Sequence, residues 1–392
     1  MNKDFLIDII DIKALVALRR ELHRFPELSG SETATAERIA SFISRYSPDS
    51  TIEGMGGTGI AAIFKGREPG SRIMFRCELD ALPIEETNEF DYKSEYNNIS
   101  HKCGHDGHMA IVAGLASLLA HKRPRRGSVI LLFQSAEETG EGADRTINDG
   151  RFGEIEPDYV FGLHNLPGFA LNTILVRSGI FAYASKGMII RLKGKESHAA
   201  RPEDGINPAL AVSKLIEELN NLPAVSMLLK EPVLVTIIFI KLGEIALGTS
   251  PGYGEIIATL RAYCSNDIRA LTEEAENIVK RIAQEEKLSF EIAYAEEFPA
   301  TINDAECVEI IETAALENRL RIKKIDKPFK WSEDFSHFTG HYKGGLFGLG
   351  AGINHPQLHS PDYDFPDRLI ESGIRIFYSI YNNILNSGHG AL

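Results

Sequence analysis

Two short, continuous apolar runs, residues 128–133 (SVILLF) and 158–163 (DYVFGL), limit the folds open to this chain. Runs of this length without polar alternation are typical of strands covered on both faces, as in a parallel sheet flanked by helices. Residues 109–121 are apolar nearly all round, which predicts a buried helix. Further strands are predicted over 59–64 and 71–79. This alternation of strands and helices indicates an α/β layered structure.

The pattern changes between residues 185 and 296. Strand-like and helix-like stretches follow one another there in the order β-α-β-β-α-β, which is the order of a ferredoxin-like α+β unit. One of these helices is predicted over 265–286, with Ser265 as its N-cap. We therefore expect a discontinuous α/β domain, residues 1–184 and 297–392, that carries an inserted α+β domain, residues 185–296.

Charge and hydropathy exclude several classes of partner. The formal net charge is −13, which argues against nucleic acid, because phosphate binding requires clustered Lys and Arg. The longest apolar runs are too short to span a bilayer, and Asp4, Asp8 and Asp11 interrupt the N-terminal apolar run, which argues against a signal peptide. Four scattered cysteines do not indicate a disulfide framework. We expect a cytoplasmic protein with no membrane or nucleic-acid partner.

Potential metal ligands gather at the ends of the predicted strands. The stretch HKCGHDGH, residues 101–108, stands directly before the predicted buried helix. Apolar strands are followed by Asp80, by Glu137 and Glu138, by His164, and by His355 and His359. In an open α/β sheet the C-terminal edge is where ligands bind. Thiolate, imidazole and carboxylate together are typical of zinc rather than of Mg²⁺ or Ca²⁺, and several of them at one edge would suit a pair of ions.

Each of these residues also has a structural interpretation when it is taken alone. Cys103 would be a small buried hydrophobic residue, His164 a structural histidine, Glu137 and Glu138 a solvated turn, and Asp80 a cap.

The glutamate pair and the cysteine each allow a functional alternative. Adjacent side chains at a strand end point in opposite directions, so Glu137 and Glu138 would divide two tasks, metal binding and proton transfer. Cys103 with His105 and a carboxylate would instead form a thiol nucleophile. That second arrangement leaves His164 and the glutamate pair without a task.

Eight stretches, in order along nearly the whole chain, resemble the M20 metallopeptidase family. They are LRRELHRFPELSGSE (18–32), ELDALPIEE (78–86), CGHDGH (103–108), QSAEETGEGA (134–143), GLHNLP (162–167), SHAARPEDGINP (197–208), SEDFSHF (332–338) and LHSPDYDF (358–365). Within the family they are most similar to the amidohydrolase branch, which includes N-acyl-amino-acid amidohydrolases, hippurate hydrolases and plant auxin-conjugate hydrolases.

The resemblance implies a binuclear site and a role for each of its residues. The implied ligands of two divalent ions, Zn²⁺ or Mn²⁺ with Co²⁺ or Ni²⁺ as alternatives, are Cys103, His105, Glu138, His164 and His359. Glu137 matches the general base that activates a metal-bound water and then protonates the leaving amine. Asp80 matches the carboxylate that orients the ligands. His198, on the inserted domain, matches the histidine that stabilises the oxyanion, from its own or from a partner subunit.

The implied reaction is hydrolysis of the amide bond of an N-acyl amino acid to a carboxylic acid and a free amino acid. Arg261 and Asn207 are candidate substrate contacts, although Arg261 would also fit as a solvated strand residue. The inserted domain is implied to act as a lid and to join two subunits in a homodimer. Two alternatives stay open: a dipeptidase or carboxypeptidase acting on short peptides, and a non-catalytic metal-binding protein of the same fold.

Two departures from the branch concern substrate identity. Glu78 stands where the branch usually has Asp, and TSPGYG, residues 249–254, stands where relatives commonly have an Asn-Val-Ile-Pro stretch. A polar contact near the substrate is therefore expected to differ, so the acyl group and the amino acid cannot be transferred from relatives.

Overall fold

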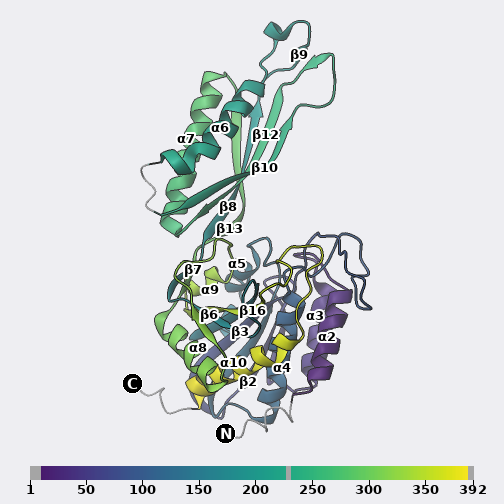
Figure 1. The fold of residues 1–392 in the computed structure, drawn as a ribbon, viewed down its shortest axis with the longest axis vertical. Helices are drawn as coiled ribbons and strands as arrows, with labels where there is room; N and C mark the ends of the chain where they lie inside the picture. Colours follow the sequence, from purple (N-terminus) through teal and green to yellow (C-terminus); the bar gives the residue numbers. More distant parts are fainter. Residues whose placement is uncertain (1–9, 227–230, 387–392) are drawn as a thin grey trace. The chain divides into compact units, whose positions relative to one another are not determined.

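The computed structural model describes residues 10–226 and 231–386, which form two compact units (Figure 1). The first unit takes in the described residues of Met1–Phe181, Thr301–Lys327 and Glu333–Leu392, and the second consists of the described residues of Ala182–Ala300 and Pro328–Ser332. An α/β unit with an inserted α+β unit is the architecture that the sequence predicts. Domain boundaries at 184/185 and 296/297 stay a prediction.

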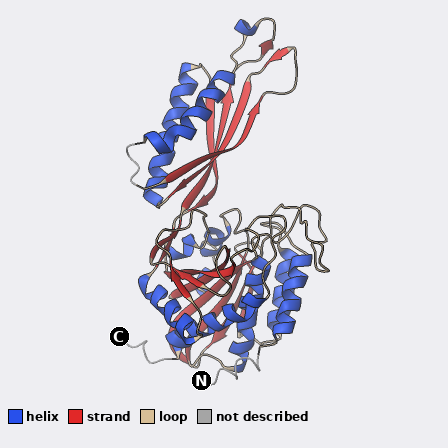
Figure 2. Ribbon diagram, in the orientation of Figure 1, coloured by secondary structure: helices blue, strands red, loops and turns tan. Residues whose placement is uncertain are grey.

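A mixed sheet forms the centre of the first unit (Figure 2). Within the described residues its strand order is β1-β2-β4-β3-β5-β16-β6-β15. The strands are β1 (Ser50–Met55), β2 (Gly59–Lys65), β3 (Glu68–Glu78), β4 (Arg126–Gln134), β5 (Tyr159–Pro167), β6 (Ile174–Val176), β15 (Ile322–Lys324) and β16 (Lys343–Gly352). Strands β4, β3, β5 and β16 are parallel neighbours, so their C-terminal ends meet at one edge. The middle strands are buried on both faces, as their continuous apolar runs predict.

Helices cover the sheet of the first unit. They are α2 (Ile12–Arg24), α3 (Thr33–Ser44), α4 (His105–His121), α8 (Ala305–Glu317) and α10 (Arg368–Leu385), with the short α5 (Gly142–Ile147), η1 (Phe152–Glu154) and α9 (Ser336–Thr339). Helix α4 begins at His105, four residues before the start predicted from hydropathy, because its first turn carries polar side chains that belong to the site. It is buried from His105 to Leu119 and packs against α2 and α10. Gly114 allows this close packing, since a Cβ there would lie 2.4 Å from Cδ1 of Ile374.

The second unit has the predicted order β-α-β-β-α-β. Its elements are β8 (Ala184–Lys193), α6 (Ala209–Val225), β10 (Val233–Leu242), β12 (Tyr253–Ala262), α7 (Ser265–Glu285) and β13 (Ser289–Phe298). The strands pair antiparallel in the order β10-β12-β8-β13, and the helices bury one face of the sheet in a separate apolar core. Small paired segments complete the chain: β9 (Ser197–His198) with β11 (Thr249–Ser250), and β7 (Gly179–Ala182) with β14 (Thr301–Asn303), besides the turn η2 (Pro202–Asp204).

The predicted N-cap of α7 is wrong. Cys264 occupies the N-cap position without a side-chain capping bond, and Ser265 is the first residue of the helix. The Ser265 hydroxyl instead accepts the N–H of Ala300 at 3.3 Å, so a contact distant in sequence replaces the local cap.

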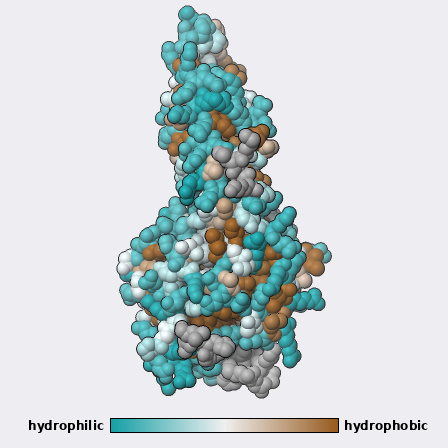
Figure 3. All heavy atoms as spheres, turned by 90° about the vertical axis from the view of Figure 1, so that its left-hand side faces the viewer, coloured by the Kyte–Doolittle hydropathy of each residue, from teal (hydrophilic) through white to brown (hydrophobic). Residues whose placement is uncertain are grey.

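On the face drawn in Figure 3, hydrophilic side chains cover most of each unit, with smaller apolar areas among them. No helix among the described residues is both long enough and apolar enough to cross a bilayer.

Candidate active site

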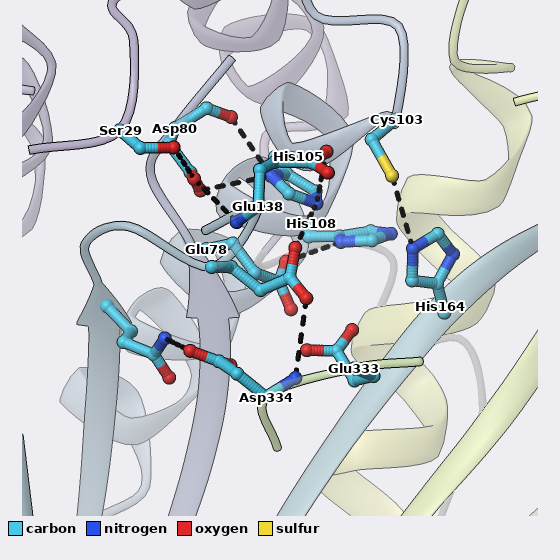
Figure 4. Close-up of polar contacts among 12 residues, drawn as sticks. Ser29, Glu78, Asp80, Cys103, His105, His108, Glu138, His164, Glu333 and Asp334 are labelled. Atoms are coloured by element: carbon cyan, nitrogen blue, oxygen red, sulfur yellow. Dashed lines mark hydrogen bonds and ion pairs between the residues drawn. The ribbon is translucent and has the colours of Figure 1, made fainter. Parts of the chain in front are cut away.

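Asp80, Cys103, His105, Glu138 and His164 lie together in the first unit (Figure 4), whereas His355, also predicted after a strand, contacts the carbonyl of Asp364 at 2.6 Å instead. Atoms of Cys103, His105 and His164 lie within 4.8 Å of one another, and so do atoms of Cys103, Glu138 and His359 and atoms of His105, Glu137 and Glu138. The loop before α4 turns at Gly104, which has φ +91° and where a Cβ would lie 2.6 Å from Oδ1 of Asn165. Any two of these groups have one residue in common, which is Cys103, His105 or Glu138, so the donors form one continuous cluster.

Hydrogen bonds to backbone carbonyls fix how two of the histidines present their rings. Nδ1 of His105 lies 2.9 Å from the carbonyl oxygen of Asp80, and Nδ1 of His164 lies 2.9 Å from that of Asn165. A carbonyl only accepts, so each Nδ1 carries a proton, and in the neutral form of each ring Nε2 keeps its lone pair. Nε2 of His164 lies 3.4 Å from Sγ of Cys103, a contact drawn as a dashed line in Figure 4. This is the tautomer in which a neutral imidazole binds a metal.

His164 and His359 reach the cluster from different local structures. His164 lies within β5, opposite Gly348 of β16, and not just past the strand end as the apolar pattern predicts. The strand continues through Pro167 because its neighbour β16 extends equally far. His359 lies in a loop with φ +63°, its N–H bonded to the carbonyl of Lys102 at 2.8 Å. Its Nε2 is 3.8 Å from Oε1 of Glu138.

Glu137 and Glu138 both lie near His105, but their other neighbours differ. Nε2 of His105 lies 3.8 Å from Oε2 of Glu137 and 3.9 Å from Oε1 of Glu138. Oε1 of Glu137 accepts the N–H of Asp334 at 3.4 Å. Glu138 also groups with Cys103 and His359, whereas Glu137 also groups with Glu333 and Asp334. Glu138 therefore lies between the sulfur and imidazole donors, while Glu137 lies at the border of the cluster, held by a backbone N–H.

Burial and crowded carboxylates shift the titration of this cluster. Burial raises the pKa of Glu138 to about 7 and that of Glu137 well above its usual range, where Glu333 and Glu138 repel its charge further. Burial opposes a charge on His105, but its bond to Asp80 and the charges of Glu78 and Glu138 raise its pKa to about 10.

Three buried atoms of this cluster accept or donate no hydrogen bond within the protein. They are Oδ1 of Asp80, Nε2 of His105 and Oε1 of Glu138. Buried polar atoms without a partner are costly, and a divalent cation would satisfy them and offset the repulsion between the carboxylates. Sulfur, imidazole and carboxylate donors so arranged fit the ligand set of Zn²⁺-type ions.

A hydrogen-bonded network that the sequence did not reveal supports the cluster. Arg76, fully buried, pairs with Glu78, Glu333 at 3.0 Å and Asp334. Oε2 of Glu78 accepts from Nδ1 of His108 at 2.6 Å. In the sequence, the signal for this network was a charged residue, Arg76, within the apolar strand predicted over 71–79.

His108 is excluded as an ion ligand by its own hydrogen bonds. Its Nε2 accepts the N–H of Asn165 at 3.3 Å while its Nδ1 donates to Glu78, so both ring nitrogens are engaged. The group formed by Glu78, His105 and His108 is therefore not a second cage for an ion.

The comparisons with known proteins agree with this donor set. The model of peptidase family M20/M25/M40 matches residues 74–383. The chain belongs to this family. It is 30% identical over 381 residues to an N-acetyl-L-cysteine deacetylase of Bacillus subtilis (96% of this chain, 89% of that protein), and 30% identical over 367 residues to a hippurate hydrolase of Campylobacter jejuni (93% and 94%).

Solved structures extend the likeness to the whole fold. A dinuclear metal-binding peptidase of the M20 family from Bacillus subtilis matches with a TM-score of 0.79 at 25% identity, over 96% of this chain and 99% of that one. A putative aminohydrolase from Staphylococcus aureus shares the fold, with a TM-score of 0.85 at 23% identity over 98% of this chain and 100% of that one. The protein is thus a metal-dependent amidohydrolase of the M20 family, as predicted, and the non-catalytic alternative is set aside.

Three of the predicted site residues of this M20 hydrolase lie in the second unit. His198, on β9, is exposed and pairs with Thr249 of β11, and its Nδ1 accepts the N–H of Ala200 at 3.0 Å. Asn207 accepts the N–H of Ala209 at 2.9 Å and donates to Oγ of Ser250 at 3.1 Å.

The third of these residues, Arg261, also has local partners. It donates to the carbonyl of Lys330 at 3.2 Å and to Oγ of Ser332 at 3.1 Å, both in the same unit. Arg261 is therefore not simply a solvated strand residue. Substrate contacts by Asn207 and Arg261 stay predictions.

Proposed function

We propose that this M20 hydrolase cleaves the amide bond of N-acyl amino acids and that Glu137 is its general base. The observation that carries the proposal is the position of the Glu137 carboxylate. Oε2 lies 3.8 Å from the unpartnered Nε2 of His105, while Oε1 is held by the N–H of Asp334. A carboxylate at the border of the donor cluster, and not needed within it, is suited to carry a proton.

The metal ligands in this proposal are Cys103, His105, Glu138, His164 and His359, which would hold two ions, Zn²⁺ or Mn²⁺ with Co²⁺ or Ni²⁺ as alternatives. Support comes from the lone pairs of the two imidazoles, which face sulfur and carboxylate donors. When bound, such ions acidify water and polarise a carbonyl oxygen.

The residues of the chain divide the remaining work. Glu137 takes a proton from the attacking water and delivers it to the departing nitrogen, so that an acid and a free amino acid leave. Asp80 is a positioning residue, since it contacts both His105 and the backbone of Glu138. His198 is proposed to stabilise the oxyanion, from its own or from a partner subunit.

Burial argues against Cys103 as a nucleophile. Burial raises the pKa of its thiol well above the ordinary value, and Glu138 and Glu137 raise it further. An activated cysteine needs the opposite, a thiol whose pKa is lowered by positive charge. A thiolate at this position would instead be stabilised as a ligand.

A homodimer is proposed through the second unit. Strand β10 is an edge of its sheet, and it exposes Leu234, Ile238, Phe239, Ile240 and Leu242. An apolar edge strand with unpaired backbone groups favours pairing with another strand, here the same strand of a second copy. A cytoplasmic location also stays a proposal.

The substrate class is tested by assaying the metal-loaded protein against matched pairs: N-acetyl and N-benzoyl amino acids, and dipeptides with the same C-terminal residue. The proposal expects kcat/KM for the N-acyl compounds to exceed that for the dipeptides at least tenfold. A preference for the free amine would instead establish the dipeptidase or carboxypeptidase alternative.

A further inference from the structure

A buried carboxylate without a task in the proposed reaction lies behind the turn that carries Glu137 and Glu138. Glu32 is 0% exposed. Its Oε1 accepts the N–H of Ala136 at 2.8 Å and that of Gly30 at 2.9 Å. Its Oε2 accepts the hydroxyl of Thr58 at 2.6 Å. These three partners all lie outside the helix that Glu32 precedes.

Glu32 occupies the N-cap position of α3 but does not cap it. The N-cap residue makes no side-chain hydrogen bond to the helix. The N–H of Thr35 is satisfied instead by Oε2 of Glu27 at 2.7 Å, which also accepts the Thr35 hydroxyl at 2.9 Å. Because another carboxylate serves the helix, stabilising α3 does not account for a buried glutamate at position 32.

The partner of Glu32 has an unfavourable backbone conformation. Ala136, with φ +52°, lies in the left-handed region that residues with a Cβ rarely adopt. Such a conformation persists only where its surroundings fix it, and it is common where function requires it. The N–H of Ala136 is held by Glu32, and its carbonyl accepts the N–H of Gly142 at 3.0 Å. Glu137 and Glu138 follow directly, so this residue sets the direction of both side chains.

We propose that Glu32 is a positioning residue for proton transfer: by binding the N–H of Ala136 it holds the left-handed turn that aims Glu137 and Glu138. The inference rests on the proposed role of Glu137. The loop that carries Glu32 also supports Asp80, because Ser29 donates to Oδ2 of Asp80 at 2.7 Å. Glu32 thus holds the turn at Ala136. Ser29 supports Asp80, whose carboxylate holds the same turn at Glu138.

The test uses Glu32→Gln, Ala136→Gly and the double variant in the full-length, metal-loaded protein. Glu32→Gln is expected to lower kcat roughly 100-fold with little change in KM, because a small displacement of a proton carrier is costly. Glycine adopts positive φ without strain, so Ala136→Gly in the same chain is expected to restore kcat at least about tenfold. If Glu32 only stabilised the fold, Ala136→Gly would not restore the kcat that Glu32→Gln loses.

Two further variants keep the test decisive. Thr58→Val removes the bond to Oε2 of Glu32 and leaves the bond between Oε1 and the N–H of Ala136 in place, so its kcat is expected to stay within about threefold of wild type. Glu32→Asp keeps the charge with a shorter reach and serves if Glu32→Gln does not fold; its lost activity must also return with Ala136→Gly. Wild-type kcat in a Glu32 variant, or a loss that glycine does not reverse in folded protein, would overturn the inference.

Glu137→Gln, assayed alongside, separates this inference from the proposed function. Retained turnover in Glu137→Gln removes the general base whatever Glu32 does. An inactive Glu137→Gln together with unaffected or unrescued Glu32 variants removes only the positioning role.

Discussion

The backbone N–H of Glu138 donates to Oδ2 of Asp80 across 2.9 Å. The other carboxylate oxygen, Oδ1, lies 3.4 Å from Nδ1 of His105, and the Asp80 carbonyl accepts from that same nitrogen. A single residue at the end of β3 thus fixes the backbone of one candidate ligand and the ring of another. The arrangement explains why a fully buried aspartate is tolerated at this position.

Asp80→Asn is expected to weaken metal binding roughly 10- to 100-fold, because an amide binds these two partners less strongly than a carboxylate. The measurement is the chelator concentration that removes half of the metal. Ser29→Ala is the matched control, since it removes only the hydroxyl bond to Oδ2 of Asp80, and it should shift the chelator midpoint less. An unchanged midpoint in Asp80→Asn would refute the orienting role.

Arg76→Met is expected to lower the free energy of unfolding by about 3–5 kcal/mol, because buried carboxylates on β3 and before α9 lose the cation that they share. Urea unfolding at neutral pH measures this loss. The control is Arg145→Ala, which removes an exposed ion pair with Glu141 and is expected to cost at most about 0.5 kcal/mol. Equal losses in the two variants would show that the buried network contributes nothing special.

The pair formed by His23 and Glu86, 3.0 Å apart, is expected to make stability depend on pH. Burial opposes a charge on His23, but hydrogen bonds to Asp106 and Glu86 raise its pKa from 6.5 to about 9. The stabilisation from protonated His23 is therefore complete below pH 6.5 and is lost as the pH rises to about 9.

The contribution of Glu86 to stability depends on pH with the opposite sign. Burial raises the pKa of Glu86, but His23 and Lys102 outweigh it and lower that pKa from 4.5 to about 2. This contribution is present above pH 4.5 and is lost as the pH falls towards 2.

The melting temperature of wild type should fall more steeply between pH 6.5 and 9 than that of His23→Gln, with the exposed His121→Gln as control. Parallel curves for wild type and His23→Gln would exclude this linkage.

Cys103→Ser is expected to lose bound metal and activity in proportion, because serine is a poor substitute for a thiolate ligand. Mass spectrometry of the native protein and the hydrolysis rate, taken on the same samples, measure both. Cys307→Ser, a buried cysteine on α8, is the control and should keep its metal. Full metal content with abolished activity, together with inactivation of wild type by alkylation, would revive the thiol nucleophile.

Ile240→Lys on β10 is expected to convert the proposed dimer to a monomer, since a charge would be placed in the apolar edge. Sedimentation velocity measures the change. Leu316→Lys, at a more exposed apolar position on α8, should leave the mass unchanged. A wild-type monomer at micromolar concentration would contradict the dimer.

The fold follows from local patterns, and so does much of the candidate site. Continuous apolar runs predict the buried strands β4 and β5, and the shared edge of parallel strands brings Glu138 and His164 into one cluster, with Asp80 bonded to Glu138. The strand registers and the start of α4 were less accessible, because they depend on neighbours across the sheet and on polar side chains in the first helical turn.

The supporting residues could not be predicted, because their role depends on partners far along the chain. Arg76 and Asp334 are 258 positions apart, and Glu32 and Ala136 are 104 apart. Glu32 sits where a helix cap is expected, so its sequence context suggests a local task that it does not have. Only the folded chain shows that its carboxylate faces the strained turn.

The most direct test of the account is to measure ion content and kcat together on Glu137→Gln. We predict about two divalent ions per chain, as in wild type, and a loss of kcat of at least about 100-fold, since the amide cannot take a proton from water. Turnover close to wild type would contradict the general-base role, and a loss of ions in step with activity would make Glu137 a ligand instead.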